Sequence, residues 1–202
     1  MVVELWKPSL RLTASAAGEA GAAPDNKGRS PVTVKVDPAP GSPSNPWRVA
    51  PGTSPPPSTA CAATGEALAD GGVDVLWIET MSSTEEVAVA IQAAKLTGLP
   101  ICATMTFDTA SRSMMGVMPA DFAEFARDSG ANFIGANCGI GPAELLHSVR
   151  GILTASGSLP VVAKGNCGIP AYVEGAIHYH GTPELMAEYA LFARDAGAKI
   201  IG

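Results

Sequence analysis

The chain has 202 residues, of which 47% are hydrophobic and 16% charged, and its formal net charge at pH 7 is −6. This acidic balance argues against nucleic-acid binding, which needs clustered lysine and arginine, and no apolar run approaches the roughly 20 residues of a membrane span. The N-terminus lacks the basic-then-apolar order of a signal peptide, and the spacing of Cys61, Cys102, Cys138 and Cys167 forms no compact disulfide framework. We therefore expect a cytoplasmic protein with free thiols.

The composition changes near residue 58. Residues 1–57 are dominated by proline, glycine, alanine and serine, and they hold no helical or strand period long enough to bury one face. We predict that this low-complexity segment is disordered or not native to the domain, with a short strand at 32–36 as its only candidate element. Residues 58–202 form the predicted domain.

From residue 58 onward, helices and strands alternate. The pattern predicts helices at 58–69, 83–96, 119–128, 142–154 and 182–194. Between and after them it predicts strands at 73–78, 100–107, 131–137, 159–164 and 198–201. Strands separated by helices, with a repeat of about 30 residues, predict βα units and a parallel sheet. The repeat alone does not distinguish an open sheet covered on both faces from a barrel.

Polar side chains stand at two of the predicted strand ends. Glu79 follows the strand at 73–78, and Cys138 follows the strand at 131–137, just before a glycine-rich turn and Pro142. In a barrel of alternating strands and helices, catalytic and metal-binding side chains gather at the carboxyl ends of the strands. A buried structural cysteine is the common alternative for Cys138, and a surface acid in a loop is the alternative for Glu79.

Two short motifs at these strand ends resemble the homocysteine S-methyltransferase family. They are Gly-x-Asn-Cys-x-x-Gly-Pro at 135–142 and Trp-Ile-Glu-Thr at 77–80. The family includes betaine–homocysteine methyltransferases and the homocysteine domain of cobalamin-dependent methionine synthase. The resemblance runs from about Cys61 to Gly202 and implies a (β/α)8 TIM barrel, with the predicted strands as about the fourth to the eighth.

A complete barrel of this kind needs about 250 residues, so the resemblance implies a partial barrel, a C-terminal-half fragment. The family's barrel begins with an Asp-Gly strand, which residues 1–57 do not match. We favour the interpretation that a frameshift or a misplaced gene start has replaced the first third of the barrel. An ordinary flexible tail is the alternative.

The resemblance also implies a zinc site. Family members bind zinc through three cysteine thiolates, and Cys138 matches the first of them. The other two lie in a Gly-Gly-Cys-Cys-Gly motif after the last barrel strand, and this sequence stops at Gly202 without it. One family ligand of three therefore remains, and we expect that these 202 residues neither hold zinc tightly nor transfer methyl groups.

Three further residues match substrate-binding positions of the family. Glu79 matches the glutamate that binds the amino group of homocysteine, and a carboxylate is a charge-assisted acceptor for an ammonium. Asn137 stands next to the thiol and can hold the turn by bonding backbone groups. Asn166 lies in a loop that resembles the family's Pro-Asn-x-Gly-x-Pro substrate loop. Cys167 occupies the variable position of that loop and is expected to be structural.

The family activity is methyl transfer to the zinc-bound homocysteine thiolate, which gives methionine. The implied partners are homocysteine and a methyl donor, for example betaine, S-methylmethionine or a corrinoid protein or domain. Two alternatives stay open: a non-catalytic remnant of a misannotated reading frame, and another TIM-barrel enzyme such as an aldolase. An aldolase would need a strand-end lysine for a Schiff base, and only Lys164 offers a start.

Overall fold

The computed structural model describes residues 2–5, 32–35, 59–108, 110–169, 171–173 and 175–202. Its helices are α1 Thr59–Asp70, α2 Thr84–Lys95, α3 Pro119–Asp128, α4 Pro142–Ala155 and α5 Pro183–Ala196. Its strands are β1 Val2–Leu5, β2 Val32–Lys35, β3 Leu76–Met81, β4 Ile101–Met105, β5 Phe133–Cys138, β6 Val161–Gly165, β7 Ala171–Val173, β8 Ala176–His178 and β9 Ile200–Ile201. All five predicted helices and all five predicted strands are present.

Local capping sets the helix boundaries where the sequence predicts them. At the start of α2, the Ser83 hydroxyl accepts from the Glu86 N–H at 3.2 Å, and the Glu86 carboxylate accepts from the Ser83 N–H at 3.3 Å. This reciprocal capping box satisfies two backbone donors that the first turn leaves without helical partners. The Thr182 hydroxyl caps α5 by accepting from the Leu185 N–H, and Gly197 ends this helix with a φ of 119°.

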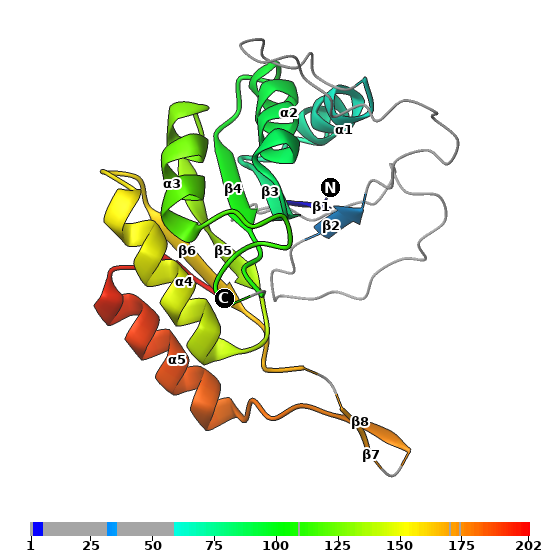
Figure 1. The fold of residues 1–202 in the computed structure, drawn as a ribbon. Coiled ribbons are helices and arrows are strands. Elements are labelled where there is room, and N and C mark those ends of the chain that lie inside the picture. Colours follow the sequence, from blue (N-terminus) through cyan, green and yellow to red (C-terminus); the bar gives the residue numbers. More distant parts are fainter. Residues whose placement is uncertain (1, 6–31, 36–58, 109, 170, 174) are drawn as a thin grey trace.

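The five predicted strands form a parallel sheet in chain order. β3, β4, β5, β6 and β9 are neighbours in that sequence, and every pairing among them is parallel. Each helix packs on the next, from α1 to α5, and Figure 1 shows α3, α4 and α5 along the same side of the sheet. Successive strands are therefore added on the same side of the sheet, and the helices cover one face. A doubly wound sheet, by contrast, has helices on both faces.

Two short strands extend the sheet beyond β3. β1 is antiparallel to β3, with Val2 opposite Glu79 and Leu5 opposite Leu76, and β2 is antiparallel to β1. β2 confirms the short strand predicted at 32–36, whereas β1 was not predicted. The remainder of residues 1–57, and with it the prediction of disorder, lies outside the described residues.

The core lies between the sheet and the helices. Alternate strand residues face the helices, as the period of two requires: Leu76, Ile78, Ala103, Met105, Ile134, Ala136, Val161 and Ala163. They pack against apolar side chains of the helices, which include Val87, Ile91, Phe122, Val149, Ile152 and Ala193. Burying this continuous apolar face is the main driving force for the fold.

The residues between them point to the opposite face, which carries most of the polar strand residues. This face includes Trp77, Glu79, Cys102, Thr104, Gly135, Asn137, Val162 and Lys164. At Gly135 a Cβ atom would lie 2.5 Å from the Val162 Cβ, so only glycine lets β5 and β6 approach this closely.

The structure differs from the predicted elements at two places. β3 begins at Leu76 rather than at residue 73, because the Val73 N–H bonds to the Leu68 carbonyl and so closes the end of α1. Residues predicted as a loop before α5 form the antiparallel hairpin β7–β8, which projects from the domain in Figure 1. Its strands have three residues each, which is too short for a recognisable period.

Candidate functional site

Asn137, near the end of β5, connects two strands that are not neighbours. Its Oδ1 accepts from the Thr80 N–H at 3.1 Å, and its Nδ2 donates to the Thr80 Oγ1 at 2.7 Å. β4 lies between β5 and β3, so these bonds cross an entire strand. Beyond β4, the Thr106 hydroxyl donates to the Asn137 carbonyl at 3.1 Å. Asn137, whose side chain is fully buried, therefore connects three strand ends, through its side chain to Thr80 and through its carbonyl to Thr106.

Cys138 places its thiol beside this amide. Its Sγ lies 3.2 Å from the Asn137 Nδ2 and 3.9 Å from the Thr80 Oγ1, and its side chain is half-buried. Consecutive residues of a regular strand point to opposite faces. Cys138 departs from this alternation, because its backbone is left-handed, with a φ of 59°. Thr80 has a similar φ of 61°. Two non-glycine residues in this sparsely populated region mark the site as locally strained.

Glu79 lies inside β3 and already has a cationic partner. The Lys164 Nζ is 2.7 Å from the Glu79 Oε1, and the Glu79 side chain is 6% exposed while that of Lys164 is 32% exposed. Lys164 is on β6, in register with Asn137. The pair thus reaches from β3 to β6 over two intervening strands, which indicates that the sheet curves toward this face. The lysine compensates a carboxylate that is otherwise costly to bury.

Asn166 lies in the loop after β6, close to the thiol segment. Its Nδ2 donates to the Gly139 carbonyl at 3.2 Å, and Gly139 directly follows Cys138. The structure therefore joins Asn137 and Cys138 to Thr80 by hydrogen bonds, and Asn166 to the residue after Cys138. Glu79 precedes Thr80 in β3 and is connected to β6 through Lys164. The four predicted site residues therefore lie at or near the carboxyl ends of β3, β5 and β6.

Sequence reasoning missed the roles of Thr80, Thr106 and Lys164. The two threonines follow apolar strands, where hydroxyl groups can bond the backbone, but that position alone does not reveal their partners. Lys164 was considered only as an aldolase lysine. A Schiff base requires the neutral amine, whereas Lys164 forms an ion pair with a buried carboxylate, so the arrangement does not favour an aldolase.

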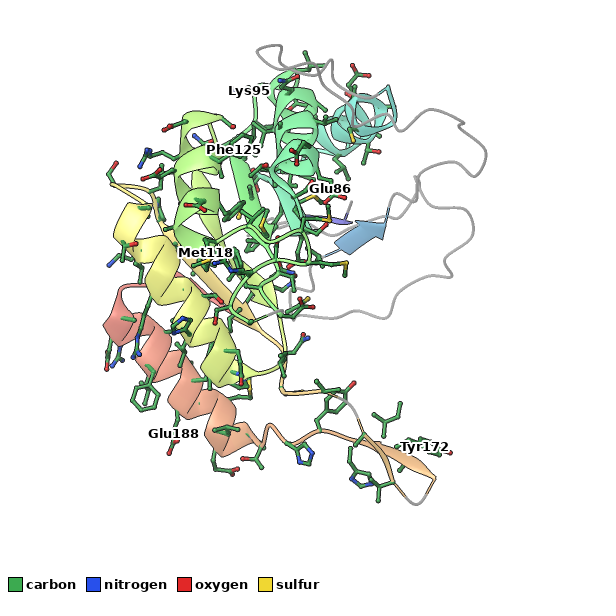
Figure 2. All side chains as sticks on the ribbon, viewed as in Figure 1. Glu86, Lys95, Met118, Phe125, Tyr172 and Glu188 are labelled. Atoms are coloured by element: carbon green, nitrogen blue, oxygen red, sulfur yellow. The ribbon has the colours of Figure 1, made fainter. Side chains whose placement is uncertain are left out.

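The described residues do not fit a complete zinc site. Zinc takes four ligands in structural sites, and three plus an open position in catalytic ones. Among the residues that the structure describes, no group of three or more histidine, cysteine, aspartate or glutamate side chains could hold a metal. The exposed His178 and Tyr172 belong to the hairpin, which Figure 2 shows projecting from the domain. In the part of the chain that the structure describes, Cys138 is the cysteine that lies beside Asn137 and Thr80.

Tyr189 of α5 packs beneath the carboxyl end of β6. Burial raises the pKa of its phenol to about 12, and its hydroxyl donates to the Gly202 carbonyl at 3.5 Å. A Cβ atom on Gly165 would lie 3.4 Å from the Tyr189 ring and hydroxyl. The phenol therefore stays protonated at neutral pH and supports β6 by packing.

The comparisons with known proteins identify the family. The homocysteine S-methyltransferase family model matches residues 58–202. The chain therefore belongs to the homocysteine S-methyltransferase family, which is a family of enzymes. It is 25% identical over 142 residues to the methionine synthases of Mycobacterium tuberculosis and Mycobacterium leprae. Each match covers 67% of this chain and 12% of the methionine synthase.

Solved structures of the homocysteine methyltransferase MmuM from Escherichia coli have a similar fold. The apo form matches with a TM-score of 0.55 at 20% identity, and the metallated form with 0.55 at 21% identity. Both matches cover 71% of this chain, and they cover 51% and 46% of the respective MmuM chains. The chain thus spans about half the length of these structures.

Among the described residues, no helix has the length and apolar character to cross a bilayer.

Proposed function

We propose that the chain carries the homocysteine-binding face of a homocysteine S-methyltransferase, which adds a methyl group to the homocysteine sulfur and yields methionine. One observation carries this proposal: Glu79 on β3 and Cys138 on β5 lie at the same edge of the parallel sheet, connected through Thr80 and Asn137. In open and closed α/β sheets, ligands bind at this carboxyl edge.

Glu79 and Cys138 have the chemistry to bind the two ends of homocysteine, its ammonium and its sulfur. The Glu79 carboxylate accepts hydrogen bonds from the substrate ammonium, and the substrate sulfur lies toward Cys138. Asn137 keeps Glu79 and Cys138 at a fixed separation, because its side chain is fully buried and connects β5 to β3 through Thr80. Asn166 borders the sulfur end through its bond to Gly139.

The fold supports a partial (β/α)8 barrel, in which the five parallel strands are about the fourth to the eighth. The strands follow one another in chain order and the helices cover one face only, as in a barrel. The curvature indicated by the Glu79–Lys164 pair has the direction that a barrel requires.

Cys138 is the residue that we propose as a zinc ligand. Since the described residues supply no complete ligand set, no reaction step is assigned to zinc, and we expect the 202-residue chain to bind zinc weakly and to lack turnover. The methyl donor is betaine, S-methylmethionine or a methylated corrinoid protein or domain. None of the four cysteines forms a disulfide bond, which supports a reducing compartment such as the cytoplasm.

The binding proposal is tested by titrating the purified 202-residue chain with L-homocysteine in a calorimeter. We expect the wild type to bind, and Glu79→Gln to weaken binding by about tenfold or more, because the ammonium loses a charged acceptor. Glu124→Gln is the matched control, since Glu124 is an exposed residue of α3. Equal affinities of the two variants, or no binding by the wild type, would exclude this function.

The expectation of inactivity is tested separately. The chain is incubated with homocysteine and each of the donors betaine, S-methylmethionine and methylcobalamin, and methionine is quantified. Methionine formation that a chelator abolishes would support the family activity and contradict our assessment of the zinc ligands.

A further inference from the structure

The Glu79–Lys164 ion pair occupies the position that the proposed function gives to the substrate ammonium. The Lys164 Nζ and the Glu79 Oε1 are 2.7 Å apart on the face opposite the helices. Lys164 is in register with Asn137, so its side chain starts one strand away from the thiol segment. Any ligand ammonium that bonds to Glu79 must therefore share the carboxylate with Lys164 or displace it.

The balance of charge at this pair restricts the ligand. A ligand with only an ammonium would displace Lys164 and leave its charge unpaired beside the sheet. A ligand with only a carboxylate would place a second negative charge next to Glu79, whose side chain is 6% exposed. A zwitterion replaces the one ion pair with two, so that every charge in the partly buried region stays compensated.

An unpartnered donor lies on the same face. The indole N–H of Trp77 is buried and has no hydrogen-bond acceptor among the described residues. Trp77 is two residues before Glu79, so both side chains point to the same face of β3, and the Lys164 Nζ is 6.0 Å from its ring centroid. The Trp77 N–H is thus a donor on this face to which a ligand carboxylate could bond.

We propose that Lys164 is a specificity-determining residue that binds the α-carboxylate of the substrate, while Glu79 binds its α-ammonium. Together the two residues select a free α-amino acid with both charged groups unmodified. This inference rests on the proposed function, and it adds to it the group that recognises the carboxylate.

Ligand analogues test the inference on the unmodified protein. L-Homocysteine, L-homocysteinamide, which lacks the carboxylate charge, and 4-mercaptobutanoic acid, which lacks the amino group, are each titrated into the wild-type chain. We expect both analogues to bind about 10- to 100-fold more weakly than homocysteine, as is typical for the loss of a charge-assisted hydrogen bond. Equal affinities for homocysteine and its amide would overturn the role of Lys164.

Substitutions then assign the effect to Lys164. In Lys164→Gln the preference for homocysteine over its amide should disappear, whereas in Lys164→Arg it should persist. Lys199→Gln removes the same charge from an exposed residue and should leave the preference unchanged. A structural role of Lys164 would lower the affinity for both ligands equally, and tighter binding of homocysteine by Lys164→Gln would mean that the lysine only competes with the substrate. Either result overturns the inference.

The two proposals fail in different ways. If the wild type binds none of the three ligands, the proposed function is wrong and the role of Lys164 falls with it. If the wild type prefers homocysteine over 4-mercaptobutanoic acid but not over the amide, the proposed function stands and only the role of Lys164 is wrong. If Lys164→Gln does not fold, the wild-type series and Lys164→Arg still decide the question.

Discussion

Asn137 and Thr80 exchange two hydrogen bonds over the intervening strand β4, with the Asn137 amide accepting from the Thr80 N–H and donating to the Thr80 hydroxyl. The same amide nitrogen lies 3.2 Å from the Cys138 thiol. One side chain therefore both closes the carboxyl edge of the sheet and positions the sulfur. Substitutions here should change the stability of the fold and the binding site together.

We expect Asn137→Ala to lower the free energy of unfolding by about 1–3 kcal/mol, because it removes the two hydrogen bonds that the buried Asn137 amide makes to Thr80. Urea denaturation followed by circular dichroism measures this loss. Asn166→Ala removes a single exposed hydrogen bond and should stay within about 0.5 kcal/mol of the wild type. Similar values for the two variants would mean that the Asn137–Thr80 connection contributes little.

A second prediction concerns the close approach of β5 and β6. Gly135→Ala places a Cβ atom 2.5 Å from the Val162 Cβ and should destabilise the fold by about 1–3 kcal/mol through overpacking. Gly65→Ala is the matched control, since a Cβ at this position in α1 meets its nearest neighbour at 3.5 Å. It should stabilise the chain by about 0.5–1 kcal/mol, because alanine is the better helix former. Urea denaturation should thus give shifts of opposite sign for the two variants.

The third prediction separates the backbone of Cys138 from its thiol. Cys138→Gly and Cys138→Ala both remove the sulfur, but glycine accepts the φ of 59° without strain. We expect the glycine variant to be about 1–2 kcal/mol more stable than the alanine variant in chemical denaturation. At Cys167, where the backbone is not left-handed, the order of the same two substitutions should reverse. An unchanged order at Cys138 would contradict the strained geometry.

The fourth prediction concerns pH. The pKa of Tyr189 is raised from 10.0 to about 12 by burial, so the folded state favours the protonated phenol. The contribution of Tyr189 is therefore fully present below about pH 10, and it is lost as the pH rises toward 12. Subtracting the unfolding free energy of Tyr189→Phe from that of the wild type isolates this decline from the titration of lysines. The matched variant Tyr179→Phe, at an exposed tyrosine, should keep the decline.

The order of the helices and parallel strands was predictable because each element carries its own local signal. Apolar runs predicted β4, β5 and β6, and caps such as Ser83–Glu86 and Thr182 predicted where the helices begin. The placement of all helices on one face of the sheet was not predictable, since the local signals do not say which face each helix covers. The hairpin β7–β8 was missed because strands of three residues carry no usable period.

The candidate site was predictable only where a motif marked it. Glu79, Asn137 and Cys138 stand in recognisable strand-end motifs, and they lie toward the carboxyl ends of β3 and β5, which the Asn137–Thr80 hydrogen bonds connect. Lys164 and Glu79 are 85 positions apart, on strands separated by two others. Their pairing depends on the curvature of the sheet, and no local pattern encodes that curvature.

The four cysteines differ in burial, so their reaction with a thiol reagent can report the opening of different parts of the fold. Cys61 and Cys102 are buried in the fold, whereas Cys138 and Cys167 are half-buried. A thiol-specific alkylating reagent would therefore modify Cys138 at a rate set by local opening of the sheet edge, and Cys102 at the rate of global unfolding. Mass spectrometry of the labelled peptides would follow the site and the core separately in a single sample, without an introduced probe.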